Sequence, residues 1–143
     1  MSLRYGLQTA RDLFDKLQRD VQLLDEEVTS DRMFNVVVTA RHLAEWIEKE
    51  SGIDRLNELR DTDLFKTCRD IADASKHFEL REDRAKQTKV DEVSSERGFG
   101  VGRYGKGGFG IGEESISIKV KSQDPVNALE FARRLIDLYR PFF

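Results

Sequence analysis

Residues 68–78 hold the side chains best suited to chemistry in this chain. If they form a helix, Arg69, Asp73 and His77 follow one another on a single stripe, because every fourth residue returns to nearly the same side of the axis. Lys76 lies beside this stripe. In a functional interpretation, His77 is a general acid or base and Asp73 orients it. Arg69 and Lys76 then neutralise a phosphate. In a structural interpretation, the stripe is a solvated face whose charge pairs each stabilise the helix by about 0.2–0.5 kcal/mol.

A second stripe contains the other histidine of the chain. Its members, separated by four, three and four residues, are Asn35, Thr39, His42 and Trp46. These positions lie on one side of a predicted helix, at the border between its apolar and charged faces. Such a border could line a groove and bind RNA. Alternatively, Trp46 packs at the edge of the core and the polar side chains satisfy hydrogen bonds between helices.

Residues 98–112 contain eight glycines in fifteen positions. Residues 100–106 match the phosphate-loop pattern of spaced glycines and a lysine, but Gly107 stands where a magnesium-binding Ser or Thr is required. No buried strand precedes the pattern and no helix is predicted after it, so we reject a nucleotide-binding loop. A basic and aromatic strip that contacts single-stranded RNA is one interpretation. Its members are Arg97, Phe99, Arg103, Tyr104, Lys106 and Phe109. The alternative is a hairpin loop that is mobile in an isolated subunit and ordered only against a partner or ligand.

The elements around these residues are predicted from hydrophobic periodicity. Apolar residues at helical spacing predict long helices over residues 7–28, 32–50, 64–80 and 126–139, and a short helix over 53–59. Thr29, Thr62 and the pair Asp124-Pro125 are predicted helix starts. Strands are predicted over residues 87–93 and 115–121. The expected fold is mainly α, an up-and-down bundle of about four main helices with one β-hairpin inserted before the C-terminal helix.

The length of 143 residues fits a single domain over residues 1–143. Within it we expect a helical core over 7–80, a hairpin over 86–121 with its glycine-rich loop, and a C-terminal helix over 124–140. The shared phase of three helices predicts a buried set. This set is Val37, Ala40, Ala44, Ile47, Leu64, Cys68, Ile71, Phe78, Leu129, Ala132 and Ile136, with Ser75 on the same face.

Composition narrows the classes of function. With 24 basic and 27 acidic residues, the formal charge of −3 does not fit a protein that binds duplex DNA. The lone Cys68 excludes an internal disulfide and any multi-cysteine metal site, and its position predicts a small core residue. No signal peptide or membrane-spanning run is visible, so we expect a cytoplasmic protein without a membrane partner.

A metal site built from the two histidines is a further possibility. His42 with Glu45, and Asp73 with His77, each share a helix face. However, the order of these pairs departs from the Glu-x-x-His motif of di-iron bundles. We therefore expect neither a metal nor another cofactor.

The helical pattern, together with Arg69, Asp70 and the downstream His77, resembles the HEPN superfamily. The motif of that family is an arginine, often followed by Asn, Asp or His, and then a histidine. Here seven residues separate Arg69 from His77, one more than the usual spacing of the family. The resemblance covers roughly residues 7–80. The chain is also similar to small bacterial proteins of unassigned activity with the pattern A-x-H-L-x-x-W followed by C-R-D-I-A-x-x-x-K-H-F, which begin here at Ala40 and Cys68.

The resemblance implies a homodimer whose two motifs form a metal-independent RNase site, often in toxin–antitoxin or phage-defence systems. By resemblance, Arg69 would stabilise the scissile phosphate and His77 would move the proton of the ribose 2′-hydroxyl. Asp73 or Asp70 would orient them. Some relatives of this kind are not catalytic, so the alternative is a non-enzymatic homo-oligomeric or partner-binding module. RNA and protein partners both remain open at this point.

Overall fold

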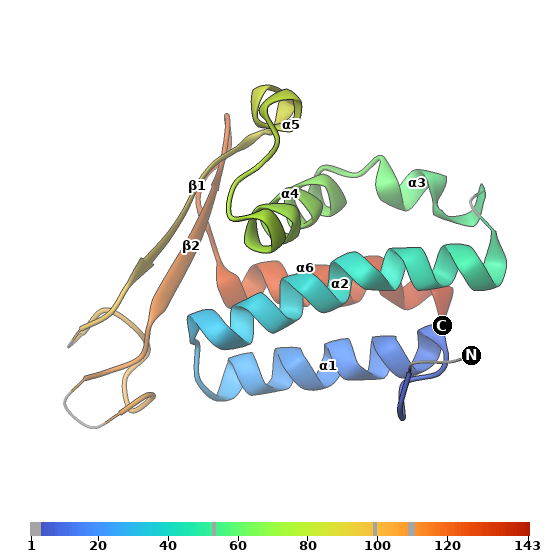
Figure 1. The fold of residues 1–143 in the computed structure, drawn as a ribbon. Coiled ribbons are helices and arrows are strands. Elements are labelled where there is room, and N and C mark those ends of the chain that lie inside the picture. Colours follow the sequence, from blue (N-terminus) through green and yellow to red (C-terminus); the bar gives the residue numbers. More distant parts are fainter. Residues whose placement is uncertain (1–3, 53, 99, 109–110) are drawn as a thin grey trace.

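The computed structural model describes residues 4–52, 54–98, 100–108 and 111–143. The long helices in this part of the chain are α1 (Ala10–Glu26), α2 (Ser30–Ser51), α4 (Asp63–His77) and α6 (Ala128–Tyr139). Helix α2 packs against α1 on one side and α4 on the other, while α6 contacts all three (Figure 1). Nowhere in the described residues is there a helix long and apolar enough to cross a lipid bilayer.

Short elements complete the fold. A 3-10 turn (Asp54–Leu56) leads into α3 (Asn57–Arg60), and α5 (Glu82–Gln87) follows α4. The predicted short helix over 53–59 is thus present as two short pieces, although Ile53 lies outside the described residues. The chain ends in a second 3-10 turn (Arg140–Phe142).

A small antiparallel sheet lies across one end of the helices (Figure 1). Its strands are β1 (Val90–Glu96), β2 (Ser115–Val120) and β3 (Val126–Asn127), with β2 in the centre. Val93 of β1 lies opposite Ile118, which in turn lies opposite Val126 of β3. Strand β2 buries every second residue, as predicted, because only one of its faces meets the core.

Side-chain caps fix where the helices begin. Thr9, Thr29 and Thr62 accept hydrogen bonds from the backbone amides three residues further on, at the starts of α1, α2 and α4. Each such cap is typically worth about 0.5–2 kcal/mol. The predicted starts at Thr29 and Thr62 are confirmed. The second helix, predicted over 32–50, ends at Ser51, with Gly52 as its C-cap at φ +89°.

The predicted start of the last helix at Asp124-Pro125 is wrong. Asn127 caps α6 instead, and its side chain accepts from the amide of Glu130. Val126 and Asn127 pair with β2, so tertiary pairing holds this segment extended. The helix can therefore begin only after that pairing ends.

One hydrophobic core joins α1, α2, α4, α6 and β2. Of the predicted buried set, seven members are buried, namely Val37, Ala40, Ala44, Ile47, Cys68, Ala132 and Ile136. Leu64, Ile71 and Leu129 are partly buried and pack against this core. Tyr139 is fully buried, and its hydroxyl donates to the carbonyl of Ala40 over 2.6 Å.

The burial predicted for Phe78 and Ser75 is wrong. Phe78 is 98% exposed and Ser75 is also exposed. Helix α4 ends at His77, and Phe78 adopts a positive φ of 71°. The helical phase that predicted its burial therefore does not extend to Phe78, and its side chain leaves the core.

The mainly α fold is confirmed, whereas the more specific up-and-down four-helix arrangement stays a prediction. The first strand, predicted over residues 87–93, is shifted in the structure and begins at Val90. Helix α5 occupies residues 82–87, where no helix was predicted. Helix α5 exposes most of its side chains and has no buried residue, so it gave no amphipathic signal in the sequence.

Candidate functional site

The two histidines of the chain line one cleft, although they lie far apart in the sequence. This cleft, which we call the His cleft, has a volume of about 610 Å³. His42 comes from α2, while Asp73, Lys76 and His77 come from the C-terminal half of α4. The packing of α4 on α2 thus brings four of the predicted site residues to one place.

The His cleft has balanced charges. Its permanent cations are Arg41, Lys76, Arg81 and Arg84, and its carboxylates are Glu45, Asp73, Glu79 and Asp83. Apolar side chains complete the lining, among them the exposed Phe34 on the rim. The site is therefore polar without a strong net charge.

Asp73 lies between two guanidinium groups inside this cleft. Arg84 Nη1 donates to Asp73 Oδ2 over 3.3 Å, and Arg41 Nε lies 3.5 Å from Oδ1. That Nε atom is buried and has no hydrogen-bond partner among the described residues, since its contact with Asp73 is an ion pair only. Asp73 thus fixes two cations that sequence reasoning did not select.

Lys76 and His77 occupy the last turn of α4 and are exposed. Cations at this end of a helix interact favourably with the helix dipole. Helix α4 places the side chains of Lys76 and His77 on the wall of the His cleft.

Arg69 lies apart from the His cleft. It lines a separate cleft of about 680 Å³, which shares only Arg41 and Glu45 with the first. Both Nε and Nη2 of Arg69 donate to Asp70 Oδ1 over 3.2 Å. Within one chain, the predicted trio is therefore divided: Asp73 and His77 line the same cleft, and Arg69 lines another.

Asp70 is buried and connects α4 to α5 and to the residue that follows α5. Besides Arg69, it accepts hydrogen bonds from Arg84 Nη1 over 2.9 Å and from the Thr88 hydroxyl over 2.7 Å. Arg84 belongs to α5 and Thr88 directly follows it. This network fixes the segment after α4, which forms one wall of the His cleft. In the sequence, the one sign of this network was a carboxylate, Asp70, at a buried position of a helix. Its partners Arg84 and Thr88 could not be identified, because they lie more than ten residues away.

The second predicted stripe also lines a cavity. Asn35, Thr39, His42 and Trp46 all border a pocket of about 270 Å³, which we call the Trp46 pocket. Residues from α1 and from the N-terminal segment close its other sides. The pocket shares Val38 and His42 with the His cleft, so the two cavities are adjacent.

Thr39 belongs to a polar network beneath this pocket. Its hydroxyl donates to Asp20 Oδ2 over 2.9 Å, and Lys16 Nζ contacts both the hydroxyl at 3.0 Å and the carboxylate at 2.5 Å. Asp20 is buried and comes from α1, so these contacts fix α1 against α2. The structural interpretation of Thr39, a hydrogen bond between helices, is thus shown.

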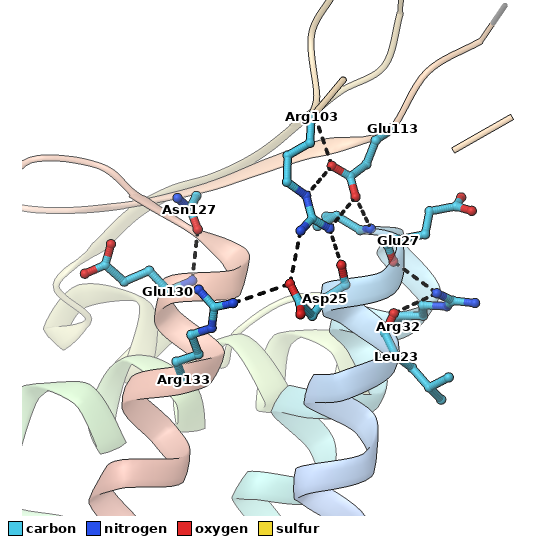
Figure 2. A network of polar contacts seen from close by, with 10 residues as sticks. Leu23, Asp25, Glu27, Arg32, Arg103, Glu113, Asn127, Glu130 and Arg133 are labelled. Atoms are coloured by element: carbon cyan, nitrogen blue, oxygen red, sulfur yellow. Dashed lines mark hydrogen bonds and ion pairs between the residues drawn. The ribbon is translucent and has the colours of Figure 1, made fainter. Parts of the chain in front are cut away.

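Arg103, predicted to bind RNA, makes a set of contacts within the chain. It donates to both carboxylate oxygens of Glu113, over 2.9 Å from Nε and 2.8 Å from Nη2. It also bonds Asp25 at the end of α1, with a distance of 3.0 Å from Nη1 to Oδ1 (Figure 2). The glycine-rich segment is therefore attached to α1 at Arg103 by intramolecular contacts, which differs from the expectation that only a partner or ligand could order it.

Glu113 is buried and lies at the centre of this network (Figure 2). It also accepts from the amide of Val28 over 2.7 Å. Burial by itself raises the pKa of Glu113. The hydrogen bonds from the Arg103 side chain and from the amides of Val28 and Arg103 outweigh burial and lower the pKa to about 2. Glu113 is thus an ionised anchor.

Two further described residues of the glycine-rich segment present their side chains to solvent. Tyr104 and Lys106 are exposed, while Phe99 and Phe109 of the predicted strip lie outside the described residues. Among the described residues, the first element after Lys106 is strand β2 and not a helix. This arrangement agrees with our rejection of a nucleotide-binding loop.

Cys68 lies in the core, as predicted. Its Sγ is 3.5 Å from the carbonyl oxygen of Val37, and burial raises the pKa of the thiol to about 12. The thiolate needed for nucleophilic chemistry is therefore disfavoured. Across the described residues, no three His, Cys, Asp or Glu side chains are grouped to hold one metal ion.

No protein-family model, curated protein or solved structure matches this chain.

Proposed function

We propose that the chain is a HEPN-like, metal-independent RNase of the toxin or defence type, with its reaction centre in the His cleft. The observation that carries this proposal is the meeting of His42 and His77 in that cleft. Imidazole is the side chain best suited to take up and release protons near neutral pH. Two imidazoles in one cleft can therefore supply a general base and a general acid.

The proposed reaction uses the ribose 2′-hydroxyl as nucleophile. His77 accepts the 2′-hydroxyl proton as the oxygen attacks the adjacent phosphorus. The bond from phosphorus to the 5′-oxygen breaks, and protonated His42 gives its proton to that leaving oxygen. Lys76 and Arg81, which are exposed at the cleft, compensate the charge that develops on the phosphate.

Arg69 can contribute to the proposed reaction only from a second subunit. In a single chain it binds Asp70 and lies outside the His cleft. A homodimer with a composite site, which the family resemblance implies, would allow Arg69 of one copy to reach the cleft of the other. Asp73 contacts Arg41 and Arg84 in the single chain, so in this proposal it orients these two cations in place of His77 or Arg69.

The test is cleavage of single-stranded RNA by the purified protein. His77→Ala and Arg69→Ala are each expected to lower the cleavage rate at least 100-fold, within the typical range for an acid–base group. Both variants should stay folded by circular dichroism, because little apolar area is lost. Excess chelator should leave the rate unchanged, and the corresponding DNA should not be cut.

A mixture of the two inactive variants separates a composite site from a single-chain site. If each site draws Arg69 and His77 from different copies, mixed dimers contain one intact site and recover part of the activity. Lys86→Ala is the matched control, because Lys86 is exposed on α5 and does not line the His cleft. RNA left uncut by the wild type would overturn the RNase proposal.

A second candidate, a non-enzymatic partner-binding module, is favoured by one observation. Phe78 is 98% exposed directly after His77, and Phe34 is 47% exposed on the rim of the same cleft. Exposed aromatic residues beside a cleft are typical of protein interfaces. This candidate predicts no turnover of RNA, together with self-association or partner binding that Phe78→Ser weakens.

A further inference from the structure

The Trp46 pocket has the size of a site for one ring system. Its volume of about 270 Å³ lies just below the range of about 300–1,000 Å³ usual for drug-sized ligands. Trp46 is half-buried and packs against the core, so the position of its indole is fixed. Tyr5, which is 85% exposed, and Leu7 close the opposite side from the N-terminal segment.

The face of the indole accepts a planar group. The guanidinium carbon of Arg4 lies 5.6 Å from the centre of the Trp46 ring, in a cation–π contact. A base that stacks on this face therefore takes the place of the Arg4 guanidinium. A guanidinium and a nucleobase are both flat groups that stack on an aromatic face, and stacking on bases is how proteins commonly bind single strands. Asn35, exposed on α2 beside the pocket, adds an amide that can donate to and accept from a base edge.

The charge of the pocket fits a ligand that carries phosphate. Of the ten described residues that line it, Arg4 and Lys16 are permanent cations and none is acidic. This contrasts with the formal charge of −3 on the whole chain and with the four carboxylates of the His cleft. Lys16 is paired with Asp20 beneath the pocket over 2.5 Å. The lining therefore contains cations and no acidic side chain, but its positive charge is not strong.

The position of the pocket connects it to the proposed reaction. His42 and Val38 line both cavities, so a base held against Trp46 would place its attached phosphate on the side of the His cleft. We propose that the Trp46 pocket binds one nucleobase of a single-stranded RNA, stacked on Trp46, and thereby positions the neighbouring phosphate at His42. The positioning of that phosphate for cleavage rests on the proposed function.

The fluorescence of Trp46 provides a direct test, because the chain has a single tryptophan. Adenosine 5′-monophosphate is expected to quench this fluorescence to a saturating level, whereas ribose 5-phosphate, which lacks the base, leaves it unchanged. A single-stranded hexa-adenylate RNA should bind at least 10-fold more tightly than the mononucleotide. Equal affinities would show a site for free nucleotides and overturn the RNA assignment.

Asn35→Asp tests the charge argument without removing the core contact of Trp46. The added carboxylate should weaken binding of the hexa-adenylate at least 5-fold. Asn57→Asp is the matched control, since Asn57 is exposed on α3 and does not line the pocket. The affinity of this variant for the hexa-adenylate should stay within 2-fold of that of the wild type. Equal effects of the two substitutions would contradict the proposed base subsite.

These measurements separate the base subsite from the RNase proposal, because they read binding and not cleavage. Quenching by the mononucleotide without any RNA cleavage would support the base subsite and contradict the RNase proposal. Cleavage that depends on His77, with a Trp46 signal that no nucleotide changes, would overturn the base subsite and leave the RNase proposal in place.

Discussion

Tyr139 shows how one hydroxyl connects two helices at the scale of a residue. Its side chain is fully buried, and burial raises the pKa of the phenol, so the group stays protonated and donates to the carbonyl of Ala40. The bond joins α6 to the middle of α2. This contact helps to hold α2, which carries His42 and Trp46, in place.

Tyr139→Phe should therefore reduce the free energy of unfolding by about 0.5–1.5 kcal/mol, because the carbonyl of Ala40 loses the Tyr139 hydroxyl and keeps only its donor within α2. Urea denaturation followed by circular dichroism measures this change. Tyr104→Phe is the matched control, since Tyr104 is fully exposed and should change stability by less than about 0.5 kcal/mol. Equal stabilities of the two variants would show that the Tyr139 hydroxyl does not stabilise the fold.

Glu113 gives the protein a specific dependence of stability on pH. Its pKa falls from 4.5 in a free side chain to about 2 in the fold. A lowered pKa contributes stability above pH 4.5, and this contribution is lost as the pH falls towards 2. The full shift corresponds to about 3 kcal/mol, which screening at the partly exposed Arg103 reduces to about 1–3 kcal/mol.

Glu113→Gln should accordingly lower stability at pH 7 and flatten the loss of stability between pH 4.5 and pH 2. Thermal denaturation across this range measures both effects. Glu58→Gln, an exposed position on α3, should keep the pH profile of the wild type. A Glu113→Gln profile as steep as that of the wild type would contradict the assigned anchor.

At the scale of elements, the glycine-rich segment depends on close backbone packing near Glu113. A Cβ atom on Gly107 would lie 2.4 Å from the carbonyl oxygen of Gly112, and Gly107 has a φ of +77°. Gly105 has a similar φ of +75° but open space around it. Substitutions at Gly107 and Gly105 therefore distinguish a steric clash of the added Cβ atom from backbone strain alone.

Gly107→Ala should open the segment, whereas Gly105→Ala should cost only the strain of its backbone, about 1 kcal/mol. Amide exchange of residues 102–113, measured by mass spectrometry, reports the opening. We expect faster exchange in Gly107→Ala than in Gly105→Ala, with unchanged exchange in α1 and α2. Identical exchange in the two variants would argue against the close contact.

At the scale of the whole molecule, Phe78 is an exposed aromatic residue next to the candidate site. Because it buries almost nothing in the single chain, Phe78→Ser should change the free energy of unfolding by less than about 0.5 kcal/mol. Phe131→Ser is the contrasting variant, since Phe131 is buried in α6 and its loss should cost about 3–5 kcal/mol.

The self-association of Phe78→Ser, measured by sedimentation, tests whether Phe78 belongs to a dimer interface. If the protein is a homodimer that uses this end of α4, Phe78→Ser should shift it towards monomer at an unchanged fold. A dimer that persists in Phe78→Ser would place the interface elsewhere on the molecule.

Much of the fold followed from local patterns in the sequence. The starts of α2 and α4, the end of α2 and the burial of Ala40, Ala44 and Cys68 were predicted, because helix phase and capping depend on residues a few positions apart. The alternation of β2 was predicted for the same reason. The grouping of Asp73, Lys76 and His77 on one wall likewise followed from the spacing within a helix.

Tertiary structure decided what the sequence left open. The packing of α5 on α4 brings Arg84 and Thr88 to the same Asp70 carboxylate that binds Arg69. Arg103 binds Glu113, and pairing with β2 moves the start of α6 to Asn127. The sequence by itself determined which side chains share a face, since that is set by local helix and strand geometry. Only the packing of distant elements determined which charges pair and that the two histidines line one cleft.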